Sequence, residues 1–207
     1  FKRKSPSKGI INDTALVEEV TSAYAKDASG ISVLTDEEFF GGAVKDLQAA
    51  RFNQIPILRK DFMIDEYQIL EAKSIGADVI LLIAACLTPA EVKSMAAFAK
   101  QIGLEILLEI HNEQELAHIC DEVDMVGVNN RNLKTFEVDI NTSLQLIHKI
   151  PTYKPAVAES GISNVNTIVT LRDAGFRGFL IGENFMKEAN PAIAFADFVT
   201  ELKAKLV

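Results

Sequence analysis

A lysine and a glutamate, each set in an apolar segment, are the residues of this chain best suited to chemistry. Lys60 ends the segment IPILRK, and Glu109 interrupts the segment ILLEI. A charged group in such a place must be paired with an opposite charge, or its pKa must shift as it loses water. A lysine and a glutamate that face one cavity can hold different protonation states at neutral pH, as stepwise proton transfer requires. The two residues therefore indicate acid–base catalysis, with a purely structural ion pair as the alternative.

Polar residues follow other apolar segments in the same way. Asn129 follows VGV, and Glu159 follows PAVA. If these segments are parallel strands of a barrel, their carboxyl ends meet at one rim, where the catalytic groups of such barrels lie. The residues expected to converge at this rim are Lys2, Lys60, Glu109, Asn129, Arg131, Glu159 and Ser160.

Glycines after the last two apolar segments, in AESG and LIGE, indicate a phosphate site. Glycine lets the backbone approach a ligand closely, and a segment after the last strand can point free N–H groups at a phosphate. The loops after strands seven and eight are the usual phosphate site of an α/β barrel. The sequence therefore predicts phosphate binding by Ser160, Gly161, Gly182 and Glu183, and the alternative is that the glycines only form turns. Glu183 fits beside a phosphate only if its backbone N–H, and not its carboxylate, faces the ligand.

The elements that must position these residues follow from the spacing of apolar side chains. Helical segments are predicted at residues 13–26, 42–52, 65–75, 88–102, 113–120, 141–150, 164–174 and 191–205. Strands are predicted at residues 1–3, 31–34, 56–60, 79–83, 105–110, 125–128, 156–158 and 178–181. Eight such units favour a closed (β/α)8 TIM barrel of eight parallel strands over an open doubly wound sheet. No GxGxxG or GxxxxGK[ST] motif follows the first strand, which disfavours a dinucleotide or nucleoside-triphosphate fold.

One domain is expected over residues 1–207. The chain has 207 residues, of which 48% are hydrophobic, and this suffices for one large core. Phe1-Lys2-Arg3 has the pattern of a strand end, so the domain would start inside the first strand. The following basic segment, up to Gly9, is expected to be a polar loop.

Composition and spacing exclude several classes of function. A net charge of −8 argues against nucleic-acid or membrane-surface binding, and no apolar run approaches the roughly 18 residues of a membrane span. Cys86 and Cys120 lack a metal-binding or CxxC spacing, which predicts reduced thiols in the core. His111, His118 and His148 lack a metal-binding pattern, so we expect no metal. A small anionic substrate, a cytoplasmic location and a monomeric state are expected.

Phe39 and Phe40 precede a pair of glycines and have two interpretations. They form either a mobile aromatic lid over a flat ligand or, as we favour slightly, a contact with the barrel rim.

The chain resembles the indole-3-glycerol-phosphate synthase family of tryptophan biosynthesis along its whole length. The resemblance is carried, in order, by FKRKSPSKG, SVLTDEEFFGG, PILRKDF, GADVILLI, LLEIH, GVNNRNL, VAESGI and FLIGENFMK. It implies a carboxy-lyase that closes the ring of 1-(2-carboxyphenylamino)-1-deoxyribulose 5-phosphate, releases carbon dioxide and water, and uses no cofactor. The family pattern also has a glutamate just before the position of Phe1 and a helical extension upstream. Neither is in this sequence, so an N-terminally truncated member is expected.

The resemblance also implies roles for individual residues. Lys60 would protonate the substrate's ketone, Lys2 would pair with the substrate carboxylate, and Glu109 would act in the dehydration. The residues that would position hydroxyl and charged groups are Asn129, Glu159 and Arg131. The pocket for the aromatic ring would be lined by Phe40, Phe62 and Leu180. The phosphate would be held, largely through backbone N–H groups, by Ser160, Gly161, Gly182 and Glu183.

Three alternatives remain at this point. A Schiff-base aldolase would use Lys60 as a nucleophile, because a desolvated lysine can attack a carbonyl. Phosphoribosylanthranilate isomerase fits a phosphate-binding barrel, but the chain lacks its motifs. A barrel that binds the substrate without turnover is the non-enzymatic alternative.

Overall fold

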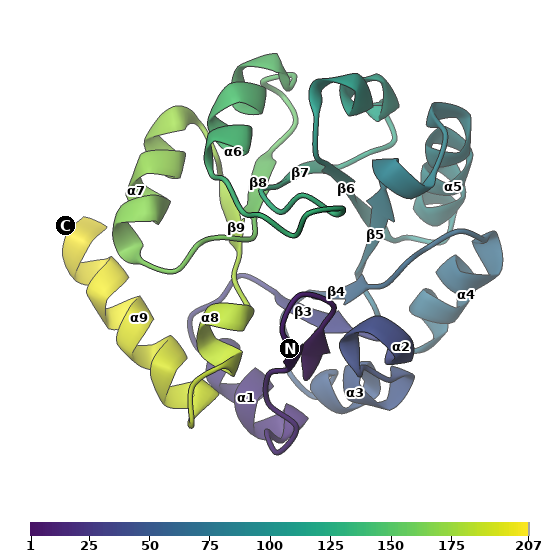
Figure 1. The fold of residues 1–207 in the computed structure, drawn as a ribbon. Helices are drawn as coiled ribbons and strands as arrows, with labels where there is room; N and C mark the ends of the chain where they lie inside the picture. The colour runs from purple at the N-terminus through teal and green to yellow at the C-terminus, as the bar shows by residue number, and fades with distance from the viewer. Residues whose placement is uncertain (207) are drawn as a thin grey trace.

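The computed structural model describes residues 1–206, and its frame is a parallel sheet curved almost into a closed barrel (Figure 1). Seven strands pair in sequence order, each parallel to the one before it. They are β3 (Ile31–Leu34), β4 (Ile57–Lys60), β5 (Val79–Ile83), β6 (Glu105–Ile110), β7 (Met125–Asn129), β8 (Ala156–Glu159) and β9 (Gly178–Leu180). The predicted α/β barrel class is confirmed.

The eighth strand position is represented by a single residue, Phe1. The amino group of Phe1 donates to the carbonyl oxygen of Ser32. The backbone N–H of Leu34 donates to the carbonyl oxygen of Phe1 at 3.2 Å. The expected eight strands are therefore corrected to seven within residues 1–206. The carbonyl of Arg3 accepts instead from the backbone N–H groups of Ile11 and Asn12, just after the short antiparallel pair that follows Arg3. That pair, β1 (Lys4–Ser5) with β2 (Gly9–Ile10), stands where a polar loop was expected.

Helices surround the sheet and connect its strands (Figure 1). The longer ones are α1 (Val17–Tyr24), α3 (Val44–Ala50), α4 (Glu66–Ser74), α5 (Pro89–Gln101), α6 (Asn141–Leu146), α7 (Val165–Ala174) and α9 (Pro191–Leu206). The start of α5 shows why the sequence places it there, since Thr88 and Glu91 form a capping box around Pro89. Shorter helical segments are α2 (Glu37–Phe40), α8 (Glu183–Met186), η1 (Ala84–Cys86), η2 (Glu113–His118) and η3 (Ile147–Lys149). The α-helix expected over 113–120 is a 3-10 helix instead.

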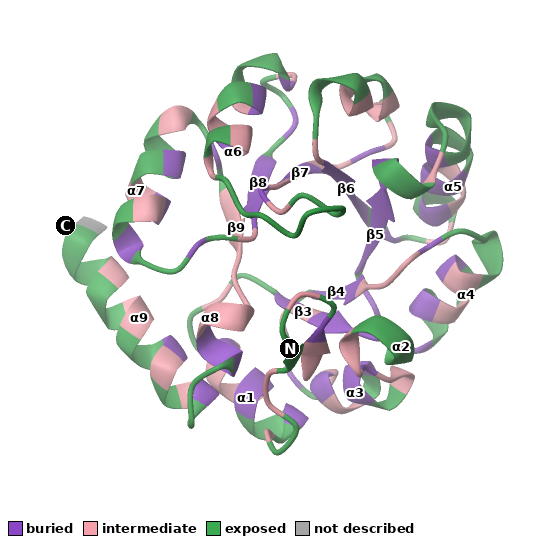
Figure 2. Ribbon diagram, viewed as in Figure 1, coloured by how far each residue is buried: buried purple, intermediate pink, exposed green. Residues whose placement is uncertain are grey.

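Side chains along each strand alternate between the barrel interior and the surrounding helices. The interior apolar layer consists of Leu58, Val79, Leu81, Ile83, Leu107 and Val157. Lys60, Glu109 and Glu159 each follow a member of this layer by two residues. They therefore share its face, one step nearer the carboxyl ends. Figure 2 shows that β4 to β8 are largely buried and that β9 is half-buried, whereas the outer sides of the helices are exposed.

The cysteines, the helix lengths and the metal-ligating side chains bear on three further expectations. Cys86 and Cys120 are free thiols as expected, but Cys86 is exposed and does not belong to the core. No helix within residues 1–206 combines the length and apolar character needed to cross a membrane. The described residues also contain no group of three or more metal-ligating side chains placed to hold a metal ion.

Candidate active site

A cluster of one lysine and two glutamates lies at the carboxyl ends of β4, β6 and β8. Lys60 Nζ donates to Glu109 Oε2 at 2.8 Å and to Glu159 Oε2 at 2.9 Å. The side chain of Lys60 is 23% exposed, whereas those of Glu109 and Glu159 are 4% and 3% exposed. The structure thus brings together three of the charged residues expected at the strand ends, with the ammonium as the accessible member.

Two carboxylates share this one ammonium, and their environments separate their pKa values. Burial raises the pKa of Glu159, and the neighbouring Glu109 adds to this against the pull of Lys60, so the pKa is about 7. Burial would also raise the pKa of Glu109, but Lys60 and His111 outweigh it and hold that pKa well below its usual range. Burial would lower the pKa of Lys60, yet the two carboxylates keep it above its ordinary value. Near neutral pH the cluster therefore holds a cationic lysine, an ionised Glu109 and a partly protonated Glu159.

The hydrogen bonds agree with this division of charge. Glu109 Oε1 accepts from Asn129 Nδ2 at 3.0 Å and lies 3.2 Å from His111 Nε2. Glu159 Oε1, by contrast, is buried and has no hydrogen-bond partner among residues 1–206. A carboxylate with an unpartnered buried oxygen is the one that gains most from a proton.

Gly127 makes room for this unusual carboxylate. A Cβ at Gly127 would lie 2.2 Å from Glu159 Oε1, so any side chain there would displace the glutamate. Gly127 is also the register partner of Glu109 across β6 and β7. The sequence analysis missed it, although a glycine inside an apolar strand is the signal of a close approach.

The titration of Glu159 should make the chain less stable as the pH rises from 5 to 8. Its folded-state pKa of about 7 is above the ordinary value of 4.5, so the folded chain binds the proton more tightly. The free energy of unfolding therefore falls as the pH rises from the unfolded-state pKa through the folded-state pKa. Between pH 5 and pH 8 the loss due to Glu159 is on the order of 2 kcal/mol. Urea unfolding at pH 5 and pH 8 measures the loss, and Glu159→Gln should reduce it.

Glu105→Gln is the matched control, since Glu105 is an exposed carboxylate at the start of β6. It should keep the wild-type difference between the two pH values. His111 titrates partly over the same interval, but it does so in all three proteins. An equal loss in the wild type and in Glu159→Gln would contradict the assignment of the extra proton to Glu159.

Two cations of the site pair with Glu183 at the start of α8. Lys2 Nζ lies 3.5 Å and Arg131 Nη2 lies 3.4 Å from Glu183 Oε2. Burial lowers the pKa of Lys2, and the charges of Arg131 and Lys60 lower it further against the opposing effect of Glu183. Asn129 joins this group to Glu109, because its Oδ1 accepts from the backbone N–H of Arg131 at 3.0 Å. The carboxylate of Glu183 thus points at two cations. Glu183 can therefore lie beside the predicted phosphate site without its carboxylate facing the phosphate.

The loops after β8 and β9 have the geometry of an anion site. Ser160 and Gly161 both have positive φ angles, of 64° and 75°, and a side chain at Gly161 would meet Val138 at 2.5 Å. Gly182 has open space instead, since no atom of the described chain lies within 4 Å of where its Cβ would stand. The N–H groups of Gly161, Gly182 and Glu183 take part in none of the hydrogen bonds found within residues 1–206. They remain free to bind a ligand.

Aromatic rings lie at the rim near β4. The rings of Phe40 and Phe62 are stacked with centroids 6.1 Å apart, and Phe39 meets the edge of Phe62 at 5.6 Å. Phe62 and Leu180 both contact the interior apolar layer. Phe39 and Phe40 lie on α2, which Asp36 caps, so the expected loop is a short helix packed at the rim.

His111 is a further residue of the site that the sequence analysis missed, since it was considered only as a metal ligand. Its position two residues after Glu109 puts both side chains on one face of an extended segment. Burial would lower the pKa of His111, but the nearby carboxylates of Glu109 and Glu115 outweigh it and raise the pKa to about 9.

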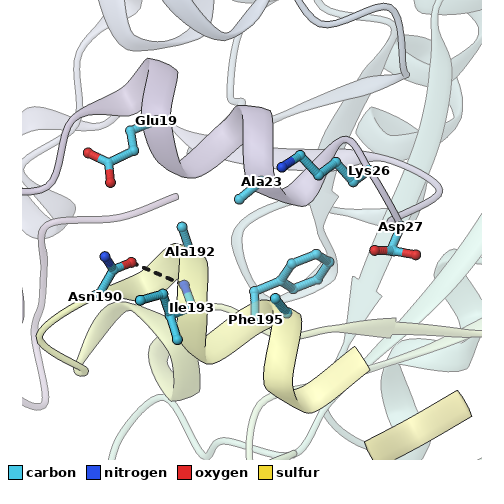
Figure 3. Close-up of a pocket in the computed structure, with 9 residues that line it drawn as sticks. Glu19, Ala23, Lys26, Asp27, Asn190, Ala192, Ile193 and Phe195 are labelled. Atoms are coloured by element: carbon cyan, nitrogen blue, oxygen red, sulfur yellow. Dashed lines mark hydrogen bonds between the residues drawn. The ribbon is translucent and has the colours of Figure 1, made fainter. Parts of the chain in front are cut away.

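A separate hollow of about 340 Å³ lies outside the barrel, between α1 and α9 (Figure 3). Glu19, Ala23 and Lys26 line one side of it, and Ile193 and Phe195 line the other. None of the predicted site residues contributes to it.

Comparisons with known proteins identify the family of the chain. The family model for indole-3-glycerol phosphate synthase matches residues 1–198. The indole-3-glycerol phosphate synthase of Bacteroides thetaiotaomicron is 49% identical over 205 residues, which covers 98% of this chain and 79% of that protein. The enzyme of the same name from Verminephrobacter eiseniae is 42% identical and covers 95% of this chain and 76% of that protein.

Solved structures with low sequence identity share the fold. The 3-hexulose-6-phosphate synthase of Salmonella typhimurium superimposes with a TM-score of 0.73 at 15% identity, over 89% of this chain and 91% of that chain. A chain of the tryptophan synthase complex from Pyrococcus furiosus gives 0.67 at 17% identity, over 90% and 91%. These likenesses concern the barrel alone, whereas the family model and the curated relatives cover the motifs at the strand ends. The chain belongs to the indole-3-glycerol phosphate synthase family.

Proposed function

We propose that this site converts 1-(2-carboxyphenylamino)-1-deoxyribulose 5-phosphate to indole-3-glycerol phosphate, carbon dioxide and water, as a carboxy-lyase of tryptophan biosynthesis. One observation supports the roles given below to Lys60, Glu109 and Glu159. The ammonium group of Lys60 lies 2.8 Å and 2.9 Å from the two buried carboxylates. Such a cluster supplies both a proton donor and a proton acceptor in one cavity.

Lys60 is the general acid of the ring closure. As the ring carbon that bears the carboxylate attacks the ketone, the ketone oxygen becomes strongly basic, and Lys60 gives it a proton to form a hydroxyl group. The raised pKa of Lys60 ensures that this proton is present before the attack. Glu159, with a pKa of about 7 and a contact of 2.9 Å to Lys60, can then return a proton to the lysine.

Glu109 acts in the dehydration. After carbon dioxide has left and its electron pair has restored the aromatic ring, the new hydroxyl group must leave as water while the neighbouring carbon loses a proton. Glu109 is ionised, and Asn129 and Lys60 fix both of its oxygens. It therefore has the charge and the fixed position of a base for this proton.

The remaining predicted residues bind the substrate. Lys2 lies in a partly desolvated position suited to the substrate carboxylate, and the leaving of that carboxylate as neutral carbon dioxide relieves the cost of its burial. Arg131 and Glu159 position hydroxyl and charged groups. The aromatic ring is placed against Phe40, Phe62 and Leu180. The phosphate is bound by the loops that contain Ser160, Gly161, Gly182 and Glu183.

A methyl group at Gly182 tests the phosphate assignment. Because the space beside Gly182 is open in the described chain, Gly182→Ala should fold with unchanged stability. The methyl group would stand between the backbone and an approaching phosphate, so KM should rise about 10-fold, which corresponds to about 1.4 kcal/mol of binding. Steady-state kinetics together with a thermal unfolding curve measure both effects.

Gly161→Ala gives the contrast. Its methyl group would meet Val138 at 2.5 Å, and its φ of 75° is unfavourable for alanine. This variant should therefore lose stability as well as substrate affinity. An unchanged KM in a fully folded Gly182→Ala would remove Gly182 from the phosphate site.

The direct test of the reaction is to mix the chain with the carboxyphenylamino-deoxyribulose phosphate and follow the rise of indole fluorescence. A rise is expected, and the absence of both turnover and substrate binding would contradict the proposal. Borohydride treatment with a ketose phosphate separates the aldolase alternative, which predicts a covalent adduct on Lys60. The raised pKa of Lys60 disfavours that alternative, because an ammonium is not a nucleophile.

We also propose that one domain of a single chain performs this reaction as a cytoplasmic monomer. Both cysteines are free thiols, as a reducing compartment would leave them. Size-exclusion chromatography with light scattering tests the monomer.

A further inference from the structure

Two carboxylates enclose His111 in a chain of contacts that leads from the surface to Glu109. His111 Nδ1 lies 3.2 Å from Glu115 Oε2, and Nε2 lies 3.2 Å from Glu109 Oε1. The same Glu115 oxygen accepts from the backbone N–H of His111 at 2.7 Å. Glu115 is itself fixed by Asn112, whose Nδ2 donates to Glu115 Oε1 at 2.7 Å. Glu115 therefore fixes the imidazole through Nδ1 and through the backbone N–H of His111, whereas Nε2 lies within ion-pair distance of Glu109.

Burial makes this chain of contacts electrostatically strong. The His111 side chain is 11% exposed, that of Glu115 is 13% exposed and that of Glu109 is 4% exposed. Nε2 is buried and has no hydrogen-bond partner within residues 1–206, and the nearby charge is that of Glu109, whose Oε1 lies 3.2 Å away. An imidazole between two carboxylates in such surroundings is stabilised as the cation, and the raised pKa of His111 agrees with this.

The reaction proposed above creates a need for such a cation. When Lys60 gives its proton to the ketone, the cluster loses its only ammonium while two buried carboxylates remain. A buried carboxylate without a cation takes up a proton. Within residues 1–206, Glu159 forms an ion pair with Lys60 alone, whereas Glu109 also has His111 at 3.2 Å.

We propose that His111, held by Glu115, is a positioning residue that keeps Glu109 ionised while Lys60 is neutral. The inference depends on the proposed function, since it assigns a task within that reaction. It also explains why two carboxylates on the same lysine differ: one keeps its charge for the dehydration, and the other takes and returns a proton.

The groups that face this chain of contacts come from five elements: Lys60 of β4, Glu109 of β6, Asn129 of β7, Glu115 of η2 and the Cys86 thiol of η1. Burial raises the pKa of Cys86, and Glu109 and Glu115 raise it further, so the thiol adds no negative charge near neutral pH. The charge of the imidazole is therefore set mainly by Glu109 and Glu115.

The test is the pH profile of kcat for the wild type, His111→Asn and Glu115→Gln. His111→Asn should lower kcat about 10- to 100-fold, because it removes the cationic ring 3.2 Å from Glu109 Oε1, and should change KM less than about threefold. In the wild type kcat should fall as the pH rises through about 9, where His111 loses its charge. This fall in kcat should move to lower pH in Glu115→Gln and vanish in His111→Asn. A change in kcat caused by the titration of Lys2 should be the same in the wild type and in both variants.

His118→Asn is the matched control. His118 lies in the same 3-10 helix as Glu115, but its ring nitrogens contact the backbone oxygens of Glu115 and Leu87 and none of Lys60, Glu109 and Glu159. It should lose comparable stability and keep the wild-type profile. A wild-type profile in His111→Asn, with kcat within twofold, would overturn the inference and leave the proposed function intact.

An NMR titration of the His111 ring in the free protein gives a readout independent of turnover. The ring should titrate near pH 9 in the wild type and at lower pH in Glu115→Gln. A ring that titrates at or below its ordinary value of 6.5 would overturn the inference, even if no protein in the series showed activity. Absent turnover in the wild type would count against the proposed function instead.

Discussion

Replacement of Lys60 by methionine should lower kcat by about 10²- to 10⁴-fold, the usual contribution of a general acid. Methionine keeps most of the volume of the lysine stem but has no proton to give. The affinity for inorganic phosphate should stay within about threefold, because the proposed phosphate contacts come from the loops after β8 and β9. Indole fluorescence measures the rate, and titration calorimetry with phosphate measures the affinity.

The fold should survive this substitution. Without the ammonium, Glu109 and Glu159 cannot both stay ionised at close range, and Glu159 would retain a proton. Lys73→Met is a matched control, since Lys73 lies on the outer side of α4, where it donates to the carbonyl of Gly103 at 2.9 Å. It should leave kcat unchanged. A Lys60→Met enzyme with normal kcat, or one whose phosphate affinity fell as much as its rate, would contradict the role of Lys60.

Replacement of Glu109 by glutamine should slow the dehydration by roughly 10²- to 10³-fold, within the usual range for a lost general base. Glutamine has nearly the same shape but cannot accept the proton. KM should change only a few-fold, because the side chain acts mainly in the transition state. Single-turnover experiments that follow carbon dioxide and indole separately should show carbon dioxide released well before indole appears.

The order of these two events is the decisive observation for Glu109. Glu105→Gln, an exposed position on the same strand, should leave both events at the wild-type rate. Equal slowing of carbon dioxide release and indole formation in Glu109→Gln would place Glu109 in an earlier step. A higher KM as the only defect would make it a binding residue.

Much of the barrel could be predicted from the sequence because its signals are local. The apolar run at 79–83 and the helical spacing over 88–102 each determine an element without reference to distant residues, and both elements are found as expected. The convergence of Lys60, Glu109 and Glu159 follows from the same reasoning, since residues two steps beyond an interior apolar layer share its face. The sequence alone therefore predicts an acid–base site at the strand ends, although it does not give the distances within that site.

The remaining features depend on contacts between segments far apart in the sequence. The need for a glycine at position 127 arises from Glu159, 32 residues later in the chain, whose Oε1 would lie 2.2 Å from a Cβ there. The charge of His111 depends on Glu115 and Glu109 together, which a search for metal-binding spacing does not detect. The 3-10 form of residues 113–118 coincides with side chains that bond back to the backbone, as Asn112 does to Glu115.

The pairing of Glu183 with Lys2 and Arg131 has a consequence for the choice among anions. In the free protein both cations already contact an anionic oxygen, at 3.5 and 3.4 Å, so the resident carboxylate competes with every incoming anion. Because one oxygen of Glu183 bridges both cations, an incoming anion gains only the difference between its own contacts and those that it displaces. A small anion such as chloride therefore gains little at this position. A substrate whose phosphate is held separately, as proposed above, by the loops after β8 and β9 has a second set of contacts that offsets the displacement of Glu183.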